Sequence, residues 1–251
     1  MIKKETAIIY GRHPVMDAIQ SGASLDKVIF QQGISGPFEK EVRLLTRQAN
    51  IPLQVIPKER MNKLTGGNHQ GIIAYISPIP FYLLADVLPT IYERSEEPLI
   101  VILDGVTDVR NFGAIARTAE ICGAHALVIP LKGSAQINAE AMKASAGALT
   151  KIPVCRENSL VNALEFLKQS GLKIMASSLK AEQPLYQLDW TAPLAIVVGA
   201  EGDGISPSMI KDADELFIIP QRGTTDSLNV SVATGMVLYE VMRQRYFIPP
   251  A

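Results

Sequence analysis

The amino-acid sequence predicts an α/β protein built on a parallel sheet, and two observations support that class. From residue 99 onward, short strands made almost wholly of apolar residues alternate with helical patterns. Strands of this kind are typical of parallel sheets that helices cover on both faces. The chain also has 251 residues, 47% of them hydrophobic, which is enough to fill a sizeable core. We therefore expect a large α/β domain preceded by a smaller one.

The smaller domain is predicted over residues 1–76. It carries ten Lys and Arg residues against six Asp and Glu, whereas the rest of the chain carries 14 against 19. If the protein binds RNA, this basic part should make many of the contacts with it. Such a surplus of basic residues is also ordinary for a solvated surface. The elements expected here, in chain order, are helix 13–21, strand 27–30, helix 38–49, strand 53–56 and strand 71–76.

A linker is predicted at residues 77–98. It begins with Pro78 and Pro80, which oppose helix formation, and it ends in the polar run 92–98. The larger domain then occupies residues 99–251, and a doubly wound parallel sheet is the expected architecture. Its elements are expected at strand 99–103, helix 113–122, strand 126–129, helix 139–149, strand 172–176, strand 194–198, strand 216–219 and helix 230–245.

Several classes of protein are disfavoured by what the sequence lacks. No window is apolar enough for a membrane span and the first residues do not form a secretory signal, so a cytoplasmic protein is expected. Cys122 and Cys155 lie far apart without a CxxC motif or a His-rich neighbourhood, so we expect buried thiols and no metal site. Neither a GxGxxG nor a GxxxxGK[ST] string occurs, which disfavours a nicotinamide or ATP enzyme.

Three loops that follow predicted strands hold the candidate functional residues, because ligands of open parallel sheets collect at the carboxyl ends of the strands. The first, residues 104–119, passes from strand to helix through glycine and polar residues. The second, residues 198–206, has three glycines and two carboxylates, and it also fits a turn before a helix capped by Ser206 with Pro207 in its first position. The third, residues 218–233, places Ser227 and Asn229 at a helix start, where either can be the N-cap.

Together these loops resemble the three motifs of the SpoU (TrmH-like) branch of the SPOUT methyltransferases. NFGA at 111–114 with RTA at 117–119 is similar to the first motif, VGAEG at 198–202 to the second, and IP at 219–220 with SLNVS at 227–231 to the third. The N-terminal part, which ends in HQGI at 69–72, resembles the ribosomal-protein-like substrate-binding domain of the RlmB subgroup. Val109 stands where the family usually has proline.

The resemblance implies a C-terminal α/β/α domain tied in a deep trefoil knot, and a homodimer in which two subunits build each active site. It also implies that S-adenosylmethionine is the cofactor and that a methyl group moves to a ribose 2′-hydroxyl. The expected substrate is a guanosine of 23S ribosomal RNA. The residues that the resemblance assigns to cofactor binding are Gly199, Ala200, Ile219, Pro220 and Leu228.

By the same resemblance, Arg117 has the central catalytic role, either as a base or as the group that polarises the hydroxyl through the adjacent phosphate. A free guanidinium stays protonated at neutral pH, so we favour a phosphate clamp that orients the hydroxyl. Asn111 and Glu201 are expected to position the ribose and the arginine, although Glu201 can also be a purely structural partner of an arginine. Ser227 and Asn229 are assigned to the substrate pocket and the methyl-donor end.

RNA contacts are expected from a further group, each member of which can equally be a surface or capping residue. Two other functions remain open: methylation of transfer RNA, whose enzymes share the three motifs, and a non-catalytic role in RNA binding or ribosome assembly. A small-molecule α/β enzyme is disfavoured by the absent phosphate-binding loops. The candidate RNA-binding residues are Arg12, His13, His69, Gln70 and Arg110.

Overall fold

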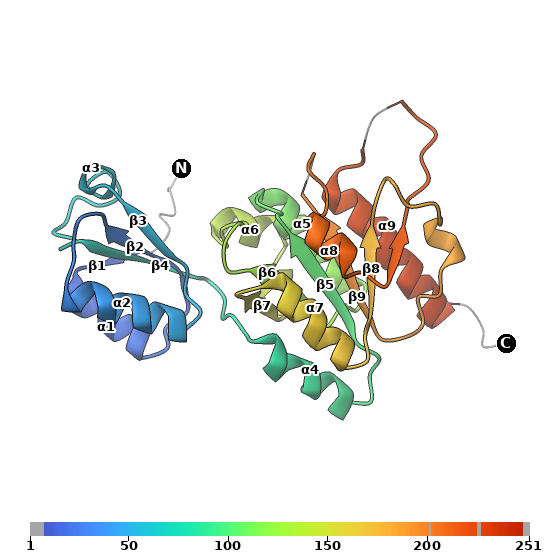
Figure 1. The fold of residues 1–251 in the computed structure, drawn as a ribbon, viewed down its shortest axis with the longest axis horizontal. Helices are drawn as coiled ribbons and strands as arrows, with labels where there is room; N and C mark the ends of the chain where they lie inside the picture. The colour runs from blue at the N-terminus through green and yellow to red at the C-terminus, as the bar shows by residue number, and fades with distance from the viewer. Residues whose placement is uncertain (1–7, 201, 225–226, 248–251) are drawn as a thin grey trace. The chain divides into compact units, whose positions relative to one another are not determined.

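A computed structural model describes residues 8–200, 202–224 and 227–247 of the chain. It shows two compact units, and each is described by itself. The N-terminal unit runs to Pro80 and includes Ile137–Ala139, and the C-terminal unit comprises Phe81–Gln136 and the chain from Glu140 onward. Both units are α/β structures (Figure 1), as the sequence predicts.

The N-terminal unit is a four-stranded sheet in the order β1-β4-β2-β3 among the described residues. Strands β2 and β3 are parallel, whereas β4 is antiparallel to both β1 and β2. The strands are β1 (Ile8–Tyr10), β2 (Leu25–Gln31), β3 (Leu53–Ile56) and β4 (Ile72–Ile76), and the helices are α1 (Arg12–Gln20), α2 (Pro37–Gln48) and α3 (Lys58–Met61).

Strand β4 shows how the two faces of this sheet are covered. Ile72 and Ala74 belong to the apolar core that the α1 residue Val15 shares, whereas Ile73 packs with Met61 of α3 in a second cluster. Because successive strand residues point to opposite faces, both faces of β4 are apolar and both must be covered.

The C-terminal unit is a six-stranded sheet in the order β10-β8-β9-β5-β6-β7 among the described residues, and all its strand pairs are parallel. This confirms the predicted parallel α/β sheet. Strands β5 and β9 at its centre are buried along nearly their whole length. The strands are β5 (Leu99–Asp104), β6 (Ala126–Pro130), β7 (Val154–Glu157), β8 (Lys173–Ser177), β9 (Leu194–Gly199) and β10 (Glu215–Phe217).

Helices cover both faces of the larger sheet. Residues of α4 (Leu84–Glu93), α7 (Leu160–Gln169) and α8 (Pro207–Lys211) share one apolar core with β5 and β6. Helices α5 (Val109–Ile121) and α9 (Val230–Met242) pack against each other on the opposite face (Figure 1). The knot implied by the resemblance stays a prediction, because strand order and register do not define how a chain threads.

Two predicted segments differ from the structure. The expected linker, residues 77–98, contains α4, whose Leu84, Val87, Leu88 and Ile91 are buried in the core of the C-terminal unit at helical spacing. The expected helix 139–149 ends early, because α6 covers only Ala139–Ala144 and the chain then turns through two residues with positive φ, Ala146 and Gly147.

The two thiols are buried, as expected from the sequence. Cys122 and Cys155 are free cysteines with relative exposures of 7% and 0%. Burial raises the pKa of the Cys155 thiol to about 12, so it stays protonated at neutral pH.

Candidate active site

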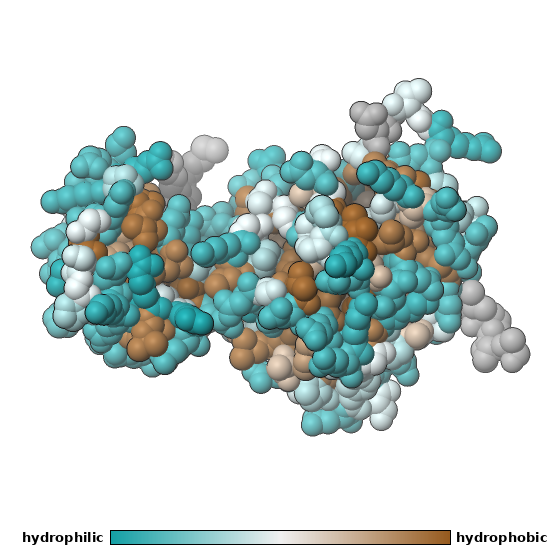
Figure 2. Space-filling model, viewed as in Figure 1, coloured by the Kyte–Doolittle hydropathy of each residue, from teal (hydrophilic) through white to brown (hydrophobic). Residues whose placement is uncertain are grey.

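A cavity of about 460 Å³ opens at the carboxyl ends of β8, β9 and β10. Five segments contribute to its lining: the end of β8 and the residues after it, the end of β9 and the loop after it, α8, the end of β10 and the residues after it, and the start of α9. The lining residues are 177–180, 198–200, 202–205, 207, 210, 217–219, 221, 227, 228, 230, 233 and 237. Figure 2 shows apolar residues reaching the surface beside α8 and β8, in the same unit. Parallel sheets bind ligands at such strand ends, so this cavity is the candidate cofactor site.

The loop after β9 is held in a tight turn that only glycine permits. Ala200 and Gly204 exchange two backbone hydrogen bonds, with N–O distances of 3.1 and 3.0 Å. A Cβ atom at Gly199 would lie 2.1 Å from the carbonyl carbon of Gly204, while Gly202 and Gly204 have positive φ angles of 89° and 70°. The glycines therefore allow one strand of backbone to pack directly on the other and to face the cavity.

The exit of this glycine loop is anchored to the neighbouring strand. Oδ2 of Asp104, at the end of β5, accepts a hydrogen bond from the Ser206 amide at 2.7 Å. Pro207 is the first residue of α8, as the sequence predicts. Ser206 stands at the N-cap position, but in the described structure its side chain makes no capping hydrogen bond to the helix. Asp104 thus ties the loop that lines the cavity to the centre of the sheet.

The starts of α5 and α9 are joined by two asparagines 118 positions apart. Nδ2 of Asn229 donates to Oδ1 of Asn111 at 3.0 Å. Oδ1 of Asn229 also accepts from the Ser231 and Val232 amides, which makes Asn229 the N-cap of α9. Asp108 caps α5 by accepting from the Arg110 and Asn111 amides. Asn229 is therefore the N-cap of α9, and it also contacts Asn111.

Arg117 lies on α5 with its side chain exposed to solvent. It does not line the cavity, and neither do Asn111 and Asn229. An Arg side chain with an exposed guanidinium can reach a ligand that binds outside the protein surface, such as RNA.

The residues predicted to bind the cofactor gather at one site with one exception. Gly199, Ala200, Ile219 and Leu228 line the cavity, as does Ser227, whereas Pro220 does not. Glu201 lies outside the described residues.

Sequence reasoning missed the segment after β8. Ser177, Ser178, Leu179 and Lys180 line the cavity, and Leu179 keeps 62% of its surface exposed. The signal was available, because this polar stretch follows directly on the predicted strand 172–176. The rule that ligands collect at strand ends would have found it.

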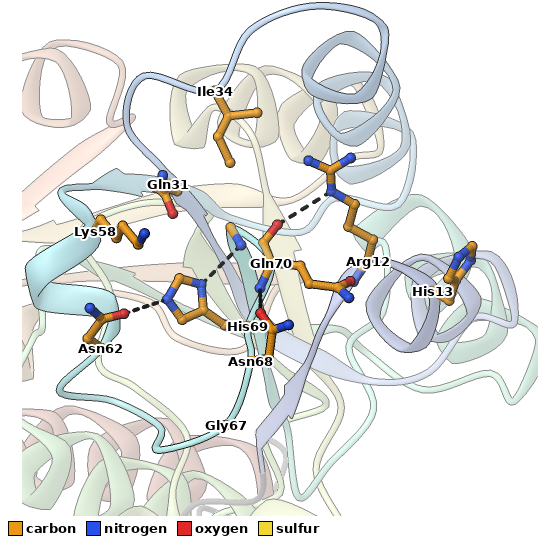
Figure 3. Close-up of a pocket in the computed structure, with 11 residues that line it drawn as sticks. Arg12, His13, Gln31, Ile34, Lys58, Asn62, Gly67, Asn68, His69 and Gln70 are labelled. Atoms are coloured by element: carbon orange, nitrogen blue, oxygen red, sulfur yellow. Dashed lines mark hydrogen bonds between the residues drawn. The ribbon is translucent and has the colours of Figure 1, made fainter.

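The candidate RNA-binding residues gather in the N-terminal unit, except for one. Arg12, His13, His69 and Gln70 all line a pocket of about 650 Å³ (Figure 3). Arg110 belongs to the C-terminal unit, where its Nε donates to Glu140 at 2.7 Å. That hydrogen bond raises the pKa of Arg110 and ties its side chain to the surface of its own unit.

His69 has a different place in this pocket from the one expected. Its side chain is buried, and both ring nitrogens are hydrogen-bonded within the unit. Nδ1 accepts from the Gly71 amide at 3.0 Å, so Nε2 carries the proton that it donates to Oδ1 of Asn62 at 2.8 Å (Figure 3). His69 therefore holds the loop that carries Gln70, and it offers no ring nitrogen to a ligand.

Two family models match the chain. The model described as the SpoU rRNA Methylase family matches residues 98–239, and the model described as RNA 2′-O ribose methyltransferase substrate binding matches residues 8–82. The chain belongs to the SpoU rRNA methylase family. SpoU enzymes are RNA 2′-O-methyltransferases that use S-adenosylmethionine, so the predicted enzyme class and cofactor are confirmed.

Similar proteins cover nearly the whole of this SpoU chain. It is 38% identical over 242 residues to the 23S rRNA (guanosine-2′-O-)-methyltransferase RlmB of Pseudomonas putida, which covers 94% of this chain and 96% of that one. It is 37% identical over 245 residues to an uncharacterized tRNA/rRNA methyltransferase of Synechocystis, where it spans 97% of its own length but 64% of the relative's. The AdoMet-bound rRNA methyltransferase of Sinorhizobium meliloti has the same fold, with a TM-score of 0.60, 25% identity and coverage of 94% and 86%.

Other kinds of site are not seen in the part of the chain that the structure describes. None of its helices is long and apolar enough to cross a membrane. Residues 8–200, 202–224 and 227–247 contain no cluster of three or more His, Cys, Asp or Glu side chains that could hold a metal ion.

Proposed function

We propose that this SpoU protein transfers the methyl group of S-adenosylmethionine to the ribose 2′-hydroxyl of a guanosine in 23S ribosomal RNA. The observation that carries the proposal is that one chain has both features this reaction needs. The C-terminal unit has a strand-end cavity, and residues 8–82 match the substrate-binding model. Relatives named for this reaction match 94–95% of the chain, including its N-terminal unit.

The cavity fits an extended cofactor with a polar and an apolar part. Gly199, Gly202 and Gly204 present backbone, whereas Ile219, Leu228 and Val237 present apolar side chains. We assign the binding of S-adenosylmethionine to Gly199, Ala200, Ile219, Leu228 and the missed segment 177–180. The cofactor supplies a sulfonium methyl group that is activated towards attack by an oxygen nucleophile.

The residues around the cavity have the task of placing the ribose. Positioning can supply roughly 7–11 kcal/mol of the barrier when two reactants are held in line. The Asn111–Asn229 pair is fixed by its own hydrogen bond and by the helix cap, and we assign it to the positioning of the ribose. Arg117, as an obligate cation, clamps the adjacent phosphate and does not take the proton. Ser227 and Glu201 complete the proposed site.

We also propose that two copies of the chain assemble to form each active site. The exposed residues Val232, Met236 and Tyr239 share one face of α9, and Ile121 of α5 is 64% exposed. Arg117 lies one turn from Ile121 on α5. A second copy would cover these apolar side chains by a symmetric contact and would bring its surface to Arg117.

Oligomeric state can be measured by light scattering after size exclusion, with the Met236→Glu variant beside the original chain. We expect a dimer for the original chain and a monomer with lost methyl transfer for the variant. A fully active monomer in either case would contradict the proposed assembly.

The reaction is tested with tritiated S-adenosylmethionine, unmodified 23S ribosomal RNA and, separately, bulk transfer RNA. After digestion, we expect labelled 2′-O-methylguanosine from the ribosomal RNA alone. Label only in transfer RNA would keep the chemistry and overturn the substrate. No label in either RNA, despite cofactor binding, would favour the non-catalytic role.

A further inference from the structure

The pocket of the N-terminal unit has an unusual set of side chains. Carboxamides come from Gln31, Asn62, Asn68 and Gln70, and cations come from Arg12 and Lys58. None of the described residues that line it is Asp or Glu. A carboxamide offers both a donor and an acceptor, as the edge of a nucleobase does, and a cation matches a phosphate. The volume, about 650 Å³, is in the range of small-molecule sites.

The two cations are not engaged by acids of the protein. In the part of the chain that the structure describes, Arg12 and Lys58 form no ion pair, whereas Arg43 of the same unit pairs with Glu39 at 2.8 Å. Arg12 instead lies over the Phe38 ring at 4.3 Å from its centroid, and its Nε donates to the Gln70 carbonyl at 3.4 Å. The guanidinium is thus held in place by an aromatic ring and a backbone carbonyl, which leaves its charge available to an anion.

The carboxamide of Gln70 is also held before any ligand arrives. Gln70 has a positive φ of 50°, and its backbone N–H donates to Oδ1 of Asn68. Its Oε1 accepts from the Arg12 amide at 3.0 Å, so its NH₂ group is the end left to meet a ligand (Figure 3). The buried His69 braces the same loop through Gly71. Such strain in the backbone of a non-glycine residue is a feature of ligand sites.

We propose that this pocket binds one unpaired nucleotide of the RNA substrate, with Arg12 and Lys58 at its phosphate and with Gln70 and Asn68 at the edge of its base. A paired base keeps its edge inside the helix, whereas an unpaired base can enter a concave site. The inference rests on the proposed function, since it names the part of the RNA that the N-terminal unit recognises. His69 is a positioning residue for Gln70.

The test measures binding of the full-length chain to two fluorescein-labelled RNA hairpins by fluorescence anisotropy, without cofactor. One hairpin carries an eight-nucleotide single-stranded loop, and the other has the same stem extended into a duplex. We expect Arg12→Ala and Gln70→Ala to weaken binding of the loop hairpin roughly tenfold and binding of the duplex less than threefold. Arg47→Ala is the matched control, because Arg47 is an exposed cation of the same unit outside the pocket.

The proposal is overturned if Arg12→Ala and Arg47→Ala have equal effects, or if both hairpins lose affinity alike. A thermal melt of each variant verifies that it is folded. Gln70→Asn and Lys58→Ala are additional pocket variants that should leave the fold intact, because both change exposed side chains. Because the assay needs no methyl transfer, its outcome is separate from that of the proposed reaction. If the chain binds the loop hairpin through this pocket but methylates no RNA, the inference stands and the proposed reaction is contradicted.

Discussion

The cavity of the C-terminal unit and the pocket of the N-terminal unit are built from different materials. The cavity is lined largely by glycine backbone and by apolar side chains such as Ile219 and Val237. The pocket is lined by carboxamides and by cations such as Arg12. Backbone that packs on backbone gives a rigid site for one small molecule, whereas polar and cationic side chains match the bases and phosphates of RNA. The difference fits the proposed functions, in which the cavity takes the cofactor and the pocket takes part of the RNA.

Arginine shows the same division. Arg245 is partly buried, and its guanidinium donates to the carbonyls of Glu97, Pro98, Trp190 and Ala192 within the C-terminal unit. Arg12 has an exposed side chain and no ion pair among the described residues. Arg245 therefore stabilises the fold of its unit, whereas the side chain of Arg12 is accessible at the surface of its own.

Gly199→Ala gives the largest expected effect and tests whether the cavity depends on backbone contact. The new Cβ would overlap backbone atoms of Gly204 and Ile205, which cannot move without opening the turn. We expect calorimetry to detect no binding of S-adenosylmethionine, while RNA binding stays within twofold of the original. Gly66→Ala in the other unit, where a Cβ would meet nothing within 4 Å, should change neither. If Gly199→Ala keeps its affinity for the cofactor, the cavity does not depend on direct backbone packing.

Arg117→Lys tests whether methyl transfer depends on the planar, two-pronged guanidinium that the proposed phosphate clamp of the C-terminal unit uses. Lysine keeps the charge but cannot hold a phosphate through two parallel hydrogen bonds. We expect methyl transfer to fall about 100-fold, a size typical for losing one such donor, with RNA affinity unchanged. The measurement is tritium incorporation at saturating RNA, with Arg94→Lys as the control. Full activity of Arg117→Lys would exclude a clamp that depends on geometry.

Arg245→Ala and Arg12→Ala together sharpen the contrast between structural and ligand-facing arginines. Removing Arg245 takes its donors away from several partly buried carbonyls, so the free energy of unfolding should drop by about 3 kcal/mol. Removing the exposed Arg12 should lower it by less than about 1 kcal/mol. Urea denaturation followed by circular dichroism measures both. Equal losses would show that Arg12 is also structural.

The smallest expected effect comes from Asp104, which positions the glycine loop through Ser206. Asp104→Ala removes the acceptor of a 2.7 Å hydrogen bond, and we expect the KM for S-adenosylmethionine to rise roughly tenfold with little change in kcat. Asp104→Asn keeps a side-chain oxygen and should recover most of that affinity. If both variants bind the cofactor like the original, the anchor has no part in shaping the cavity.

Much of the fold followed from local patterns, and the exceptions have physical causes. Buried strands such as β5 and β9 are apolar throughout, so they could be found from composition alone. Strand β7 is short and contains Arg156 and Glu157, and it was missed. Helix α4 falls in the predicted linker, because Pro78, Pro80 and the polar run 92–98 outweighed its apolar spacing. Prolines oppose a helix interior but say little about the helix that begins four residues later.

By itself, the sequence determined the α/β class, the strands that end in ligand loops, the start of α8 at Ser206 and Pro207, and the family. These follow from short-range rules, because periodicity, glycine freedom and capping depend on neighbours in the chain. Only the tertiary structure decided that Asn111 meets Asn229, that His69 faces inward and that Arg12 meets Gln70. The reason is the order of strands in each sheet: β8 lies beside β9 and β4 beside β2, and no local pattern specifies which strands become neighbours.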